Sequence, residues 1–169
     1  TTIVSGGCVG EVKVWKEGDG RWACTKTLKD HEVSVRAVVF SPNGELLASG
    51  SYDGEINVYN VANYFSRMHI LDGHTYCVNA LSFSPNSTRL VLSSYTNIQV
   101  WNPTEGTLLK TVDNAHTSTI YAVAHSPNGN LIASGCWDGM IKIWDAKTLT
   151  LKFAIENAHT NIINNLSFT

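Results

Sequence analysis

Histidine, serine and aspartate together can form a hydrolase triad, in which serine attacks, histidine takes its proton and aspartate orients the histidine. The sequence holds this combination twice, at the same internal spacing. The two sets are His31, Ser49 and Asp53, followed by Tyr59, and His116, Ser134 and Asp138, followed by Trp144. An active site seldom occurs twice in one chain, and neither serine lies in the Gly-x-Ser-x-Gly context of a nucleophile elbow. The duplication therefore argues against catalysis, although an enzyme or small-ligand binder using a His/Ser/Asp site remains the alternative.

Composition excludes several other classes of protein. The 169 residues carry 12 basic and 14 acidic side chains, so the formal net charge is −2, and the basic residues are spread singly. A protein that follows a phosphate backbone needs a basic surface, so no nucleic-acid partner is expected. No apolar run approaches the ~18 residues of a membrane span, so no membrane partner is expected. The four cysteines form no CxxC pair and predict reduced thiols in an intracellular protein, cytoplasmic or nuclear.

Three sequence markers recur with one period of about 43 residues. The first is a histidine in a loop, at His31, His74, His116 and His159. The second is an aromatic residue after Val or Ile, at Trp15, Tyr59, Trp101 and Trp144. The third is a Ser-Pro-Asn turn that follows Phe40, Phe83 and His125, with Phe168 as a last, partial copy. Three independent markers with a common period show that the chain is an array of repeats.

Each repeat predicts short strands joined by turns. Val35–Phe40 is rich in β-branched residues and stops at Ser-Pro-Asn-Gly, and Leu46–Ser49 follows. Asp53-Gly54 is a strong hairpin signal before Ile56–Tyr59, and a fourth strand ends near Leu71. No segment has a sustained helical period, so the fold class is all-β. Apolar residues on both faces predict small sheets stacked between neighbours.

The repeats resemble those of WD-repeat β-propellers, in which a unit of ~40–45 residues forms a four-stranded blade between a Gly-His and a Trp-Asp dipeptide. Gly73-His74 and Trp144-Asp145 match these dipeptides, and the other units carry looser forms. The resemblance implies four four-stranded antiparallel blades in a partial or half propeller spanning residues 1–169. The expected blades are 30–72, 73–114 and 115–157, and a composite blade in which 158–169 completes 1–29.

In the WD-repeat family, the His/Ser/Asp sets form structural hydrogen-bond chains from tryptophan through serine and histidine to aspartate. The resemblance therefore implies that the two sets are structural and that no residue is catalytic. It also places the four repeated histidines in different blades, too far apart to share a metal ion at ~2 Å. No metal and no cofactor is expected.

The resemblance further implies a non-catalytic scaffold for protein–protein interaction, with a rigid top face presented to protein or peptide partners. In this family, the residue before the turn aspartate and those opening the first strand point to that face. The matching positions here are Arg36, Tyr52, Asn79, Tyr121, Trp137 and Asn164.

Four blades of this width are expected to leave apolar blade faces uncovered, because most rings of this family have seven or eight blades. Large uncovered apolar faces mark association sites. The chain is therefore expected to be either part of a larger propeller or one half of a homodimer that completes an eight-bladed ring.

Overall fold

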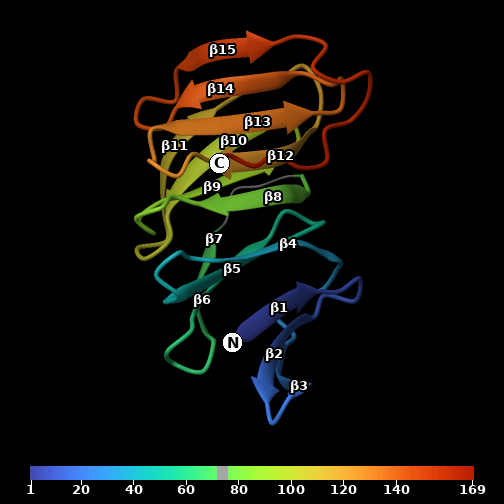
Figure 1. The fold of residues 1–169 in the computed structure, drawn as a ribbon, viewed down its shortest axis with the longest axis vertical. Helices are drawn as coiled ribbons and strands as arrows, with labels where there is room; N and C mark the ends of the chain where they lie inside the picture. Colours follow the sequence, from blue (N-terminus) through green and yellow to red (C-terminus); the bar gives the residue numbers. More distant parts are fainter. Residues whose placement is uncertain (72–75) are drawn as a thin grey trace.

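The computed structural model describes residues 1–71 and 76–169, and within these residues it contains fifteen strands and no helix (Figure 1). No described segment is therefore a helix long and apolar enough to cross a membrane. The strands form four antiparallel sheets, which are the blades of a partial propeller. All-β architecture is confirmed, as is the expected arrangement in blades.

Three of the sheets have four strands and the sheet nearest the N-terminus has three. The three-stranded sheet contains β1 (Thr2–Gly6), β2 (Val12–Gly18) and β3 (Arg21–Leu28). The second contains β4 (Val35–Phe40), β5 (Leu46–Ser51), β6 (Ile56–Asn60) and β7 (Ser66–Leu71). The third contains β8 (Val78–Phe83), β9 (Leu90–Ser94), β10 (Asn97–Asn102) and β11 (Thr107–Val112). The fourth contains β12 (Ile120–His125), β13 (Leu131–Cys136), β14 (Ile141–Asp145) and β15 (Leu151–Ile155).

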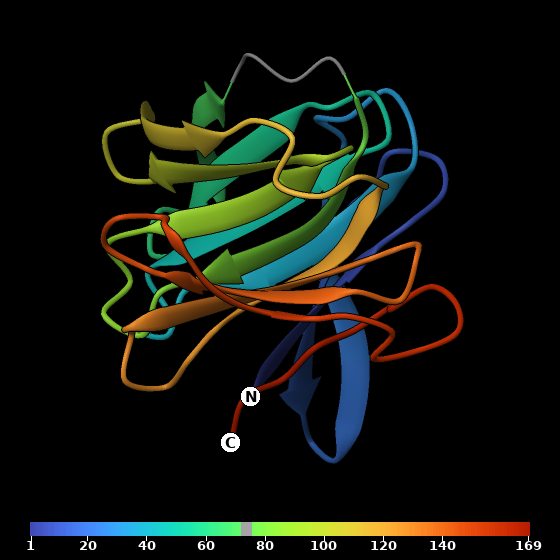
Figure 2. The ribbon, with the colours of Figure 1, turned by 90° about the horizontal axis from the view of Figure 1, so that it is seen from above.

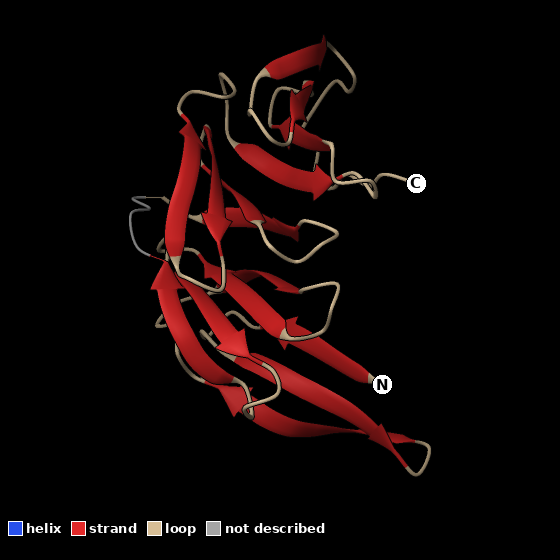
Figure 3. Ribbon diagram, turned by 90° about the vertical axis from the view of Figure 1, so that its left-hand side faces the viewer, coloured by secondary structure: helices blue, strands red, loops and turns tan. Residues whose placement is uncertain are grey.

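The four sheets follow one another in sequence order (Figure 1), and together they form a curved row (Figure 3). Neighbouring sheets meet through β1 and β4, β4 and β8, and β8 and β12, which form the inner edge of the row. Seen from above, the sheets overlap along this row (Figure 2). The chain therefore stacks its blades side by side, as the apolar residues on both strand faces predict.

The Ser-Pro-Asn turns form because their side chains replace missing backbone hydrogen bonds. The Ser41 hydroxyl donates to the Asn43 side chain at 2.6 Å and accepts from the Leu46 amide at 2.9 Å. The turn at Ser126 repeats both bonds. Gly44 has a φ of 74°, which glycine adopts without steric cost. These turns fix where the first strand of a blade ends and the second begins.

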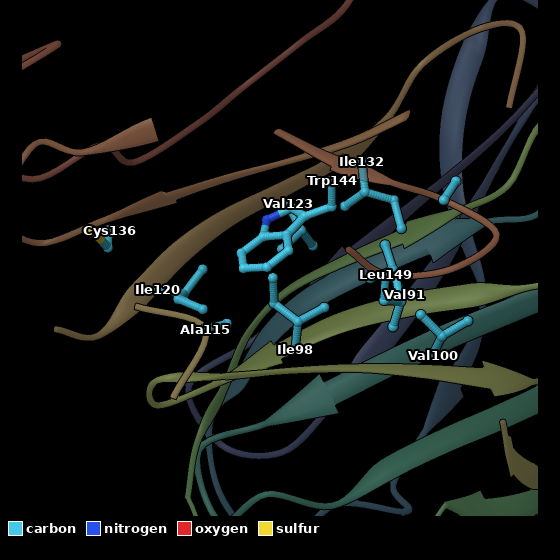
Figure 4. Packing of buried hydrophobic residues seen from close by; sticks show 11 residues of the cluster. Val91, Ile98, Val100, Ala115, Ile120, Val123, Ile132, Cys136, Trp144 and Leu149 are labelled. Carbon is cyan, nitrogen blue, oxygen red and sulfur yellow. The ribbon is translucent and has the colours of Figure 1, made fainter. Parts of the chain in front are cut away.

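Apolar side chains fill the space between neighbouring sheets. One cluster joins the third and fourth sheets and contains Ile98, Ile120, Ile132 and Trp144, all at most 5% exposed. Figure 4 shows the Trp144 ring among these side chains. Two similar clusters lie between the first and second and between the second and third sheets. Each sheet is therefore held mainly by burial against its neighbours, at ~25 cal/mol per Å² of apolar surface.

Hydrogen bonds also join the outer strands to the next blade. Lys26 of β3 donates to the carbonyl of Tyr64, and Lys110 of β11 donates to the carbonyl of Thr148. His69 of β7 holds the same register position and lies 2.8 Å from the carbonyl oxygen of Thr104. The outermost strands thus follow the same period as the sequence markers.

The predicted composite blade is not formed in this structure. Residues 162–169 contain no strand, and β1–β3 lack the inner strand that the other three sheets have. The two segments lie in different parts of the row, because β1–β3 begin it and residues 162–169 contact β13 at its other end (Figure 1). A pairing of 158–169 with 1–29 needs these ends to be brought together, and it stays a prediction.

Candidate functional site

The fourth blade contains a buried hydrogen-bond chain. The Trp144 indole Nε1 donates to the Ser134 hydroxyl at 2.8 Å, and His116 Nε2 lies 2.7 Å from the same oxygen. Ser134 is fully buried and His116 is 2% exposed. Burial lowers the pKa of His116 to about 4, with Lys142 lowering it further and Asp138 acting in the opposite direction. The imidazole is therefore neutral near pH 7, and one hydroxyl bonds to one nitrogen of each ring.

Asp138 does not complete this chain as expected. Its carboxylate accepts from the Thr117 hydroxyl at 3.0 Å and from the Met140 amide at 3.2 Å, and it lies 2.6 Å from the Cys136 sulfur. His116 Nδ1 is buried with no hydrogen-bond partner among the described residues. The Met140 and Cys136 contacts hold Asp138 in its own turn, and the Thr117 bond joins that turn to the loop before β12. The connected set of Trp144, Ser134 and His116 therefore does not include Asp138.

The second blade holds only one link of the equivalent chain. His31 Nε2 lies 2.7 Å from the Ser49 hydroxyl, as in the fourth blade. Tyr59 replaces the tryptophan, and its hydroxyl is buried without a hydrogen-bond partner in the described part of the chain. Burial raises the pKa of the Tyr59 phenol far above its ordinary value. The tyrosine fills the space of the indole ring without making the bond of the indole nitrogen.

Asp53 is likewise held by its own turn rather than by His31. Its carboxylate accepts from the Ser51 hydroxyl and from the Glu55 amide, the latter at 3.0 Å. The carboxylate next to His31 is that of Glu55, which lies 3.4 Å from His31 Nδ1, and not that of Asp53 as the resemblance implied. Burial lowers the pKa of His31, and Glu55 is the strongest of the groups that oppose this shift.

One link that the sequence analysis missed lies in the first blade. Trp15 Nε1 donates to the Ser5 hydroxyl at 3.0 Å, which matches the pair of Trp144 and Ser134. The spacing in the sequence contained the signal, since Ser5 precedes Trp15 by the same interval as Ser134 precedes Trp144. Trp101, in the third blade, instead donates to the Gln99 side chain at 3.0 Å.

These sets are poorly placed for catalysis. A nucleophile must reach a substrate, whereas the oxygen of Ser134 is buried and already bonded to two rings. Burial raises the pKa of the Cys136 thiol to about 11, so this cysteine is protonated near pH 7. Among the described residues, no three His, Cys, Asp or Glu side chains are grouped to hold a metal ion. Gly73 and His74 lie outside the described residues.

In contrast to these buried sets, a group of exposed aromatic side chains lies where β5, β9 and β13 end. Tyr52 is 60% exposed, and the Arg36 guanidinium lies 5.7 Å from its ring centre. Trp137 is 53% exposed, and its ring centre lies 6.1 Å from that of Tyr121. Arg36 and Tyr121 are the second residues of β4 and β12, so the predicted top-face positions are paired in the second and fourth blades.

A third pair at this end was not predicted. Tyr76 and Tyr95 stack with ring centres 4.9 Å apart, and both are exposed. Tyr95 follows β9 as Tyr52 follows β5, and this was the signal available in the sequence. We call this end of the sheets the aromatic face. It comprises Arg36, Tyr52, Tyr76, Tyr95, Tyr121 and Trp137.

Two predicted partner-binding residues differ from the others in their surroundings. The Asn79 amide donates to the Ile120 carbonyl of the next blade at 3.0 Å, so this side chain joins two blades. Asn164 is exposed in the segment that follows the fourth blade. The predicted face is thus continuous over three blades, and Asn79 contributes mainly to the junction beneath it.

Comparison with known proteins adds a family match. The family described as "WD domain, G-beta repeat" matches residues 22–60, 65–102 and 106–145. A WD repeat domain-containing protein 83 homolog of Dictyostelium discoideum is 30% identical over 76% of this chain and 39% of its own length. The COMPASS component SWD3 of Saccharomyces cerevisiae is 32% identical over 70% of the chain and 37% of its own length. The pre-mRNA-processing factor 19 of Bos taurus is 30% identical over 98% of the chain and 32% of its own length. The chain thus spans less than half the length of these relatives.

Proposed function

The chain belongs to the WD-repeat family, and from that premise we propose that it is a non-catalytic scaffold whose aromatic face binds protein or peptide partners. The single observation that carries the proposal is the run of three pairs on three consecutive blades, each with at least one exposed aromatic ring. Aromatic and arginine side chains are the commonest anchors of protein interfaces.

The aromatic face is suited to binding because its side chains are held before a partner arrives. Tyr52 donates its backbone amide to the Ser34 carbonyl, and Trp137 donates its own to the Thr119 carbonyl, both at 2.9 Å. Each anchor is thus tied to the loop that enters the first strand of its blade. Binding therefore costs little conformational entropy at these two residues, because their backbone is already ordered before a partner binds.

Several observations favour binding over catalysis. The histidine of each His/Ser/Asp set is buried and the serine has no exposed oxygen, so neither set can act on a substrate without opening the blade. One relative is named as a COMPASS component, which supports a role in an assembly. The free thiols support the proposal of an intracellular protein, cytoplasmic or nuclear.

Affinity purification with matched variants tests this proposal. The wild-type protein is compared with a double variant, Arg36→Ala with Trp137→Ala, and bound proteins are quantified by mass spectrometry. Trp22→Ala is the control, because Trp22 is also exposed but lies on β3, away from the aromatic face. We expect partners of the wild type to fall at least about tenfold with the double variant and to persist with the control. Equal recovery from all three proteins refutes the assignment.

We further propose that additional blades cover the two end faces of the row. Ile3 of β1 and Leu151, Phe153 and Ile155 of β15 are exposed apolar residues at these ends. We rank further blades of a longer protein first as the group that covers these end faces, because the relatives are more than twice as long as the matched region. A second copy that completes an eight-bladed ring ranks second. Sedimentation equilibrium of the purified chain tests both, and a stable folded monomer would reject them.

A further inference from the structure

A polar pocket of about 390 Å³ lies at the end of the blades opposite the aromatic face. Its walls are the turn between β8 and β9, the turn between β12 and β13, and the first residues after β14. These three turns lie at one end because the strands that they join are antiparallel. The volume lies within the usual range for small-ligand sites, ~300–1,000 Å³.

The pocket is basic. Arg89 and Lys147 line it, and they also line an adjoining pocket of about 150 Å³ together with Lys110. No described residue in either lining is an aspartate or glutamate. In the part of the chain that the structure describes, neither Arg89 nor Lys147 has an ion-pair partner. Two cations therefore face a shared space whose described lining holds no carboxylate, and the nearby Asp145 carboxylate, outside that lining, accepts from the backbone amide of Lys147 at 3.0 Å.

Arg89 is held in place across the blade junction. Its Nη1 donates to the Ala146 carbonyl of the next blade at 3.0 Å, which leaves the other guanidinium N–H groups available. Lys110 is tied by its ammonium group to the carbonyl of Thr148, one residue beyond Lys147. Hydrogen bonds to backbone carbonyls thus hold the charged groups of Arg89 and Lys110 in place.

Side-chain amides add neutral donors to this wall. Asn86 and Asn128 both line the pocket, and each uses its side-chain oxygen to accept bonds within its own turn. Their NH₂ groups donate to no acceptor among the described residues. His125 also lines the pocket, and burial lowers its pKa to about 4, assisted by Arg89 and opposed by a backbone hydrogen bond at Ser82. His125 is therefore neutral near pH 7, and the charge comes from arginine and lysine.

The neighbouring junction provides an internal comparison. The equivalent space between the second and third sheets is a pocket of about 280 Å³. Glu45 lines it at the turn position of Arg89, since both residues directly precede the second strand of their blade. Among the residues that the structure describes, no arginine or lysine lines that pocket. The basic pocket is thus a property of this junction and not a consequence of the repeated fold.

We propose that the pocket at Arg89 and Lys147 binds a phosphate monoester. The planar guanidinium presents paired N–H groups that match phosphate oxygens, and the ammonium groups add point charges. Two or three cations should bind a phosphate dianion more tightly than they bind a carboxylate with a single charge. The phosphate can belong to a free small molecule or to a phosphorylated side chain of a peptide, and the chemistry of recognition is the same.

Calorimetric titration of the purified protein tests the site with defined probes. These are O-phosphoserine, a hexapeptide with one central phosphoserine, and aspartate as the carboxylate comparison. We expect saturable binding of at least one phosphate probe, and binding of aspartate at least about tenfold weaker. Tighter binding of the free amino acid points to a small molecule, and tighter binding of the peptide points to a phosphorylated chain. Either preference supports the site.

Arg89→Gln and Lys147→Gln should each weaken phosphate binding about tenfold, because each removes one charged hydrogen-bond donor. Lys147 is exposed, so its replacement keeps the fold even if the loss of the Arg89 bond to Ala146 loosens the junction. Lys29→Gln is the matched control, with the same change in charge on a distant loop. Absence of saturable phosphate binding, equal binding of aspartate, or an equal loss with Lys29→Gln overturns the proposal.

Discussion

Replacing Ser134 by alanine should destabilise the fold more than the same replacement at the other serines of this register position. The Ser134 hydroxyl is the only partner that the structure gives to Trp144 Nε1 and His116 Nε2 among the described residues. Both rings are buried, so water cannot replace the lost oxygen. An orphaned buried polar group costs ~1–3 kcal/mol, so Ser134→Ala should lower the free energy of unfolding by about 3 kcal/mol.

Two matched serines calibrate this value. Ser49 bonds to His31, and His31 Nε2 also lies 3.3 Å from the Asn57 side-chain nitrogen, so Ser49→Ala removes one bond without leaving that nitrogen alone and should cost about 1 kcal/mol. Ser5 bonds to Trp15 at an exposed site where water can substitute, so Ser5→Ala should cost about 0.5 kcal/mol. The expected order is therefore Ser134, then Ser49, then Ser5.

Urea unfolding followed by tryptophan fluorescence and circular dichroism measures the three losses. With a urea dependence of about 2 kcal/mol per molar, Ser134→Ala should lower the unfolding midpoint by about 1.5 M and Ser5→Ala by less than about 0.5 M. Equal shifts for the three variants would mean that the buried hydrogen-bond chain contributes nothing beyond the loss of a hydroxyl. A reversed order would refute the reasoning altogether.

Three further results are expected. The unfolded His125 side chain takes up its proton near pH 6.5 but the folded one only near pH 4, so stability is full above 6.5 and falls by about 3 kcal/mol towards 4. His125→Phe should reduce the slope of this part of the curve measured by urea unfolding, while the buried His116 still contributes to it, and an unchanged slope would contradict the assignment. Gly139→Ala should cost at least about 3 kcal/mol, because the added Cβ would lie 1.9 Å from a backbone oxygen. Gly44→Ala, which has a similar φ and open space, should cost only about 1–2 kcal/mol, and equal thermal shifts would show that the close contact is unimportant. Maleimide should label the exposed Cys8 and leave the buried Cys136 unlabelled, as mass spectrometry can show.

The strands and turns were predictable because their causes are local. The Ser-Pro-Asn turn closes on itself through the hydroxyl of Ser41 and the amide of Asn43, and the hydrogen bonds of Ser126 follow the same plan. Alternating apolar residues and a period of about 43 residues supplied the remainder. Each of these signals depends on residues within one repeat.

The buried His/Ser/Asp sets were predictable only in part. Whether the aspartate of each set bonds to the histidine depends on the geometry of the turn that holds the aspartate. Asp53 accepts from Ser51 and a backbone amide of its own turn, and Asp138 accepts from a backbone amide of its own turn and from Thr117 in the loop before β12. Glu55 reaches His31 instead. Nothing in the spacing of the residues distinguishes these outcomes.

The basic pocket was not predictable from the period, because it depends on departures from that period. Arg89 stands where the preceding repeat has Glu45, and His125 stands where two repeats have phenylalanine. Their conjunction with Lys147 appears only when three turns from two blades are placed at one end. The repeats in a sequence thus predict the features that all units share. A site formed by residues that differ between units becomes visible only in the structure.

The segment after the fourth blade is best understood from the contacts that join the other blades. At three places, a β-branched residue opposes a glycine whose missing side chain makes room for it. The residue is Val35 opposite Gly6, Val78 opposite Gly50, and Ile163 opposite Gly135. Added Cβ atoms would lie 2.6–2.7 Å from these side chains. Val35 and Val78 belong to the inner strands of the following blades, so residues 162–169 lie where another inner strand would begin. They contain no strand, and no described segment pairs with them as the second strand of a further blade. This geometry favours continuation of the row, by further blades or by a second copy, over closure of four blades on themselves.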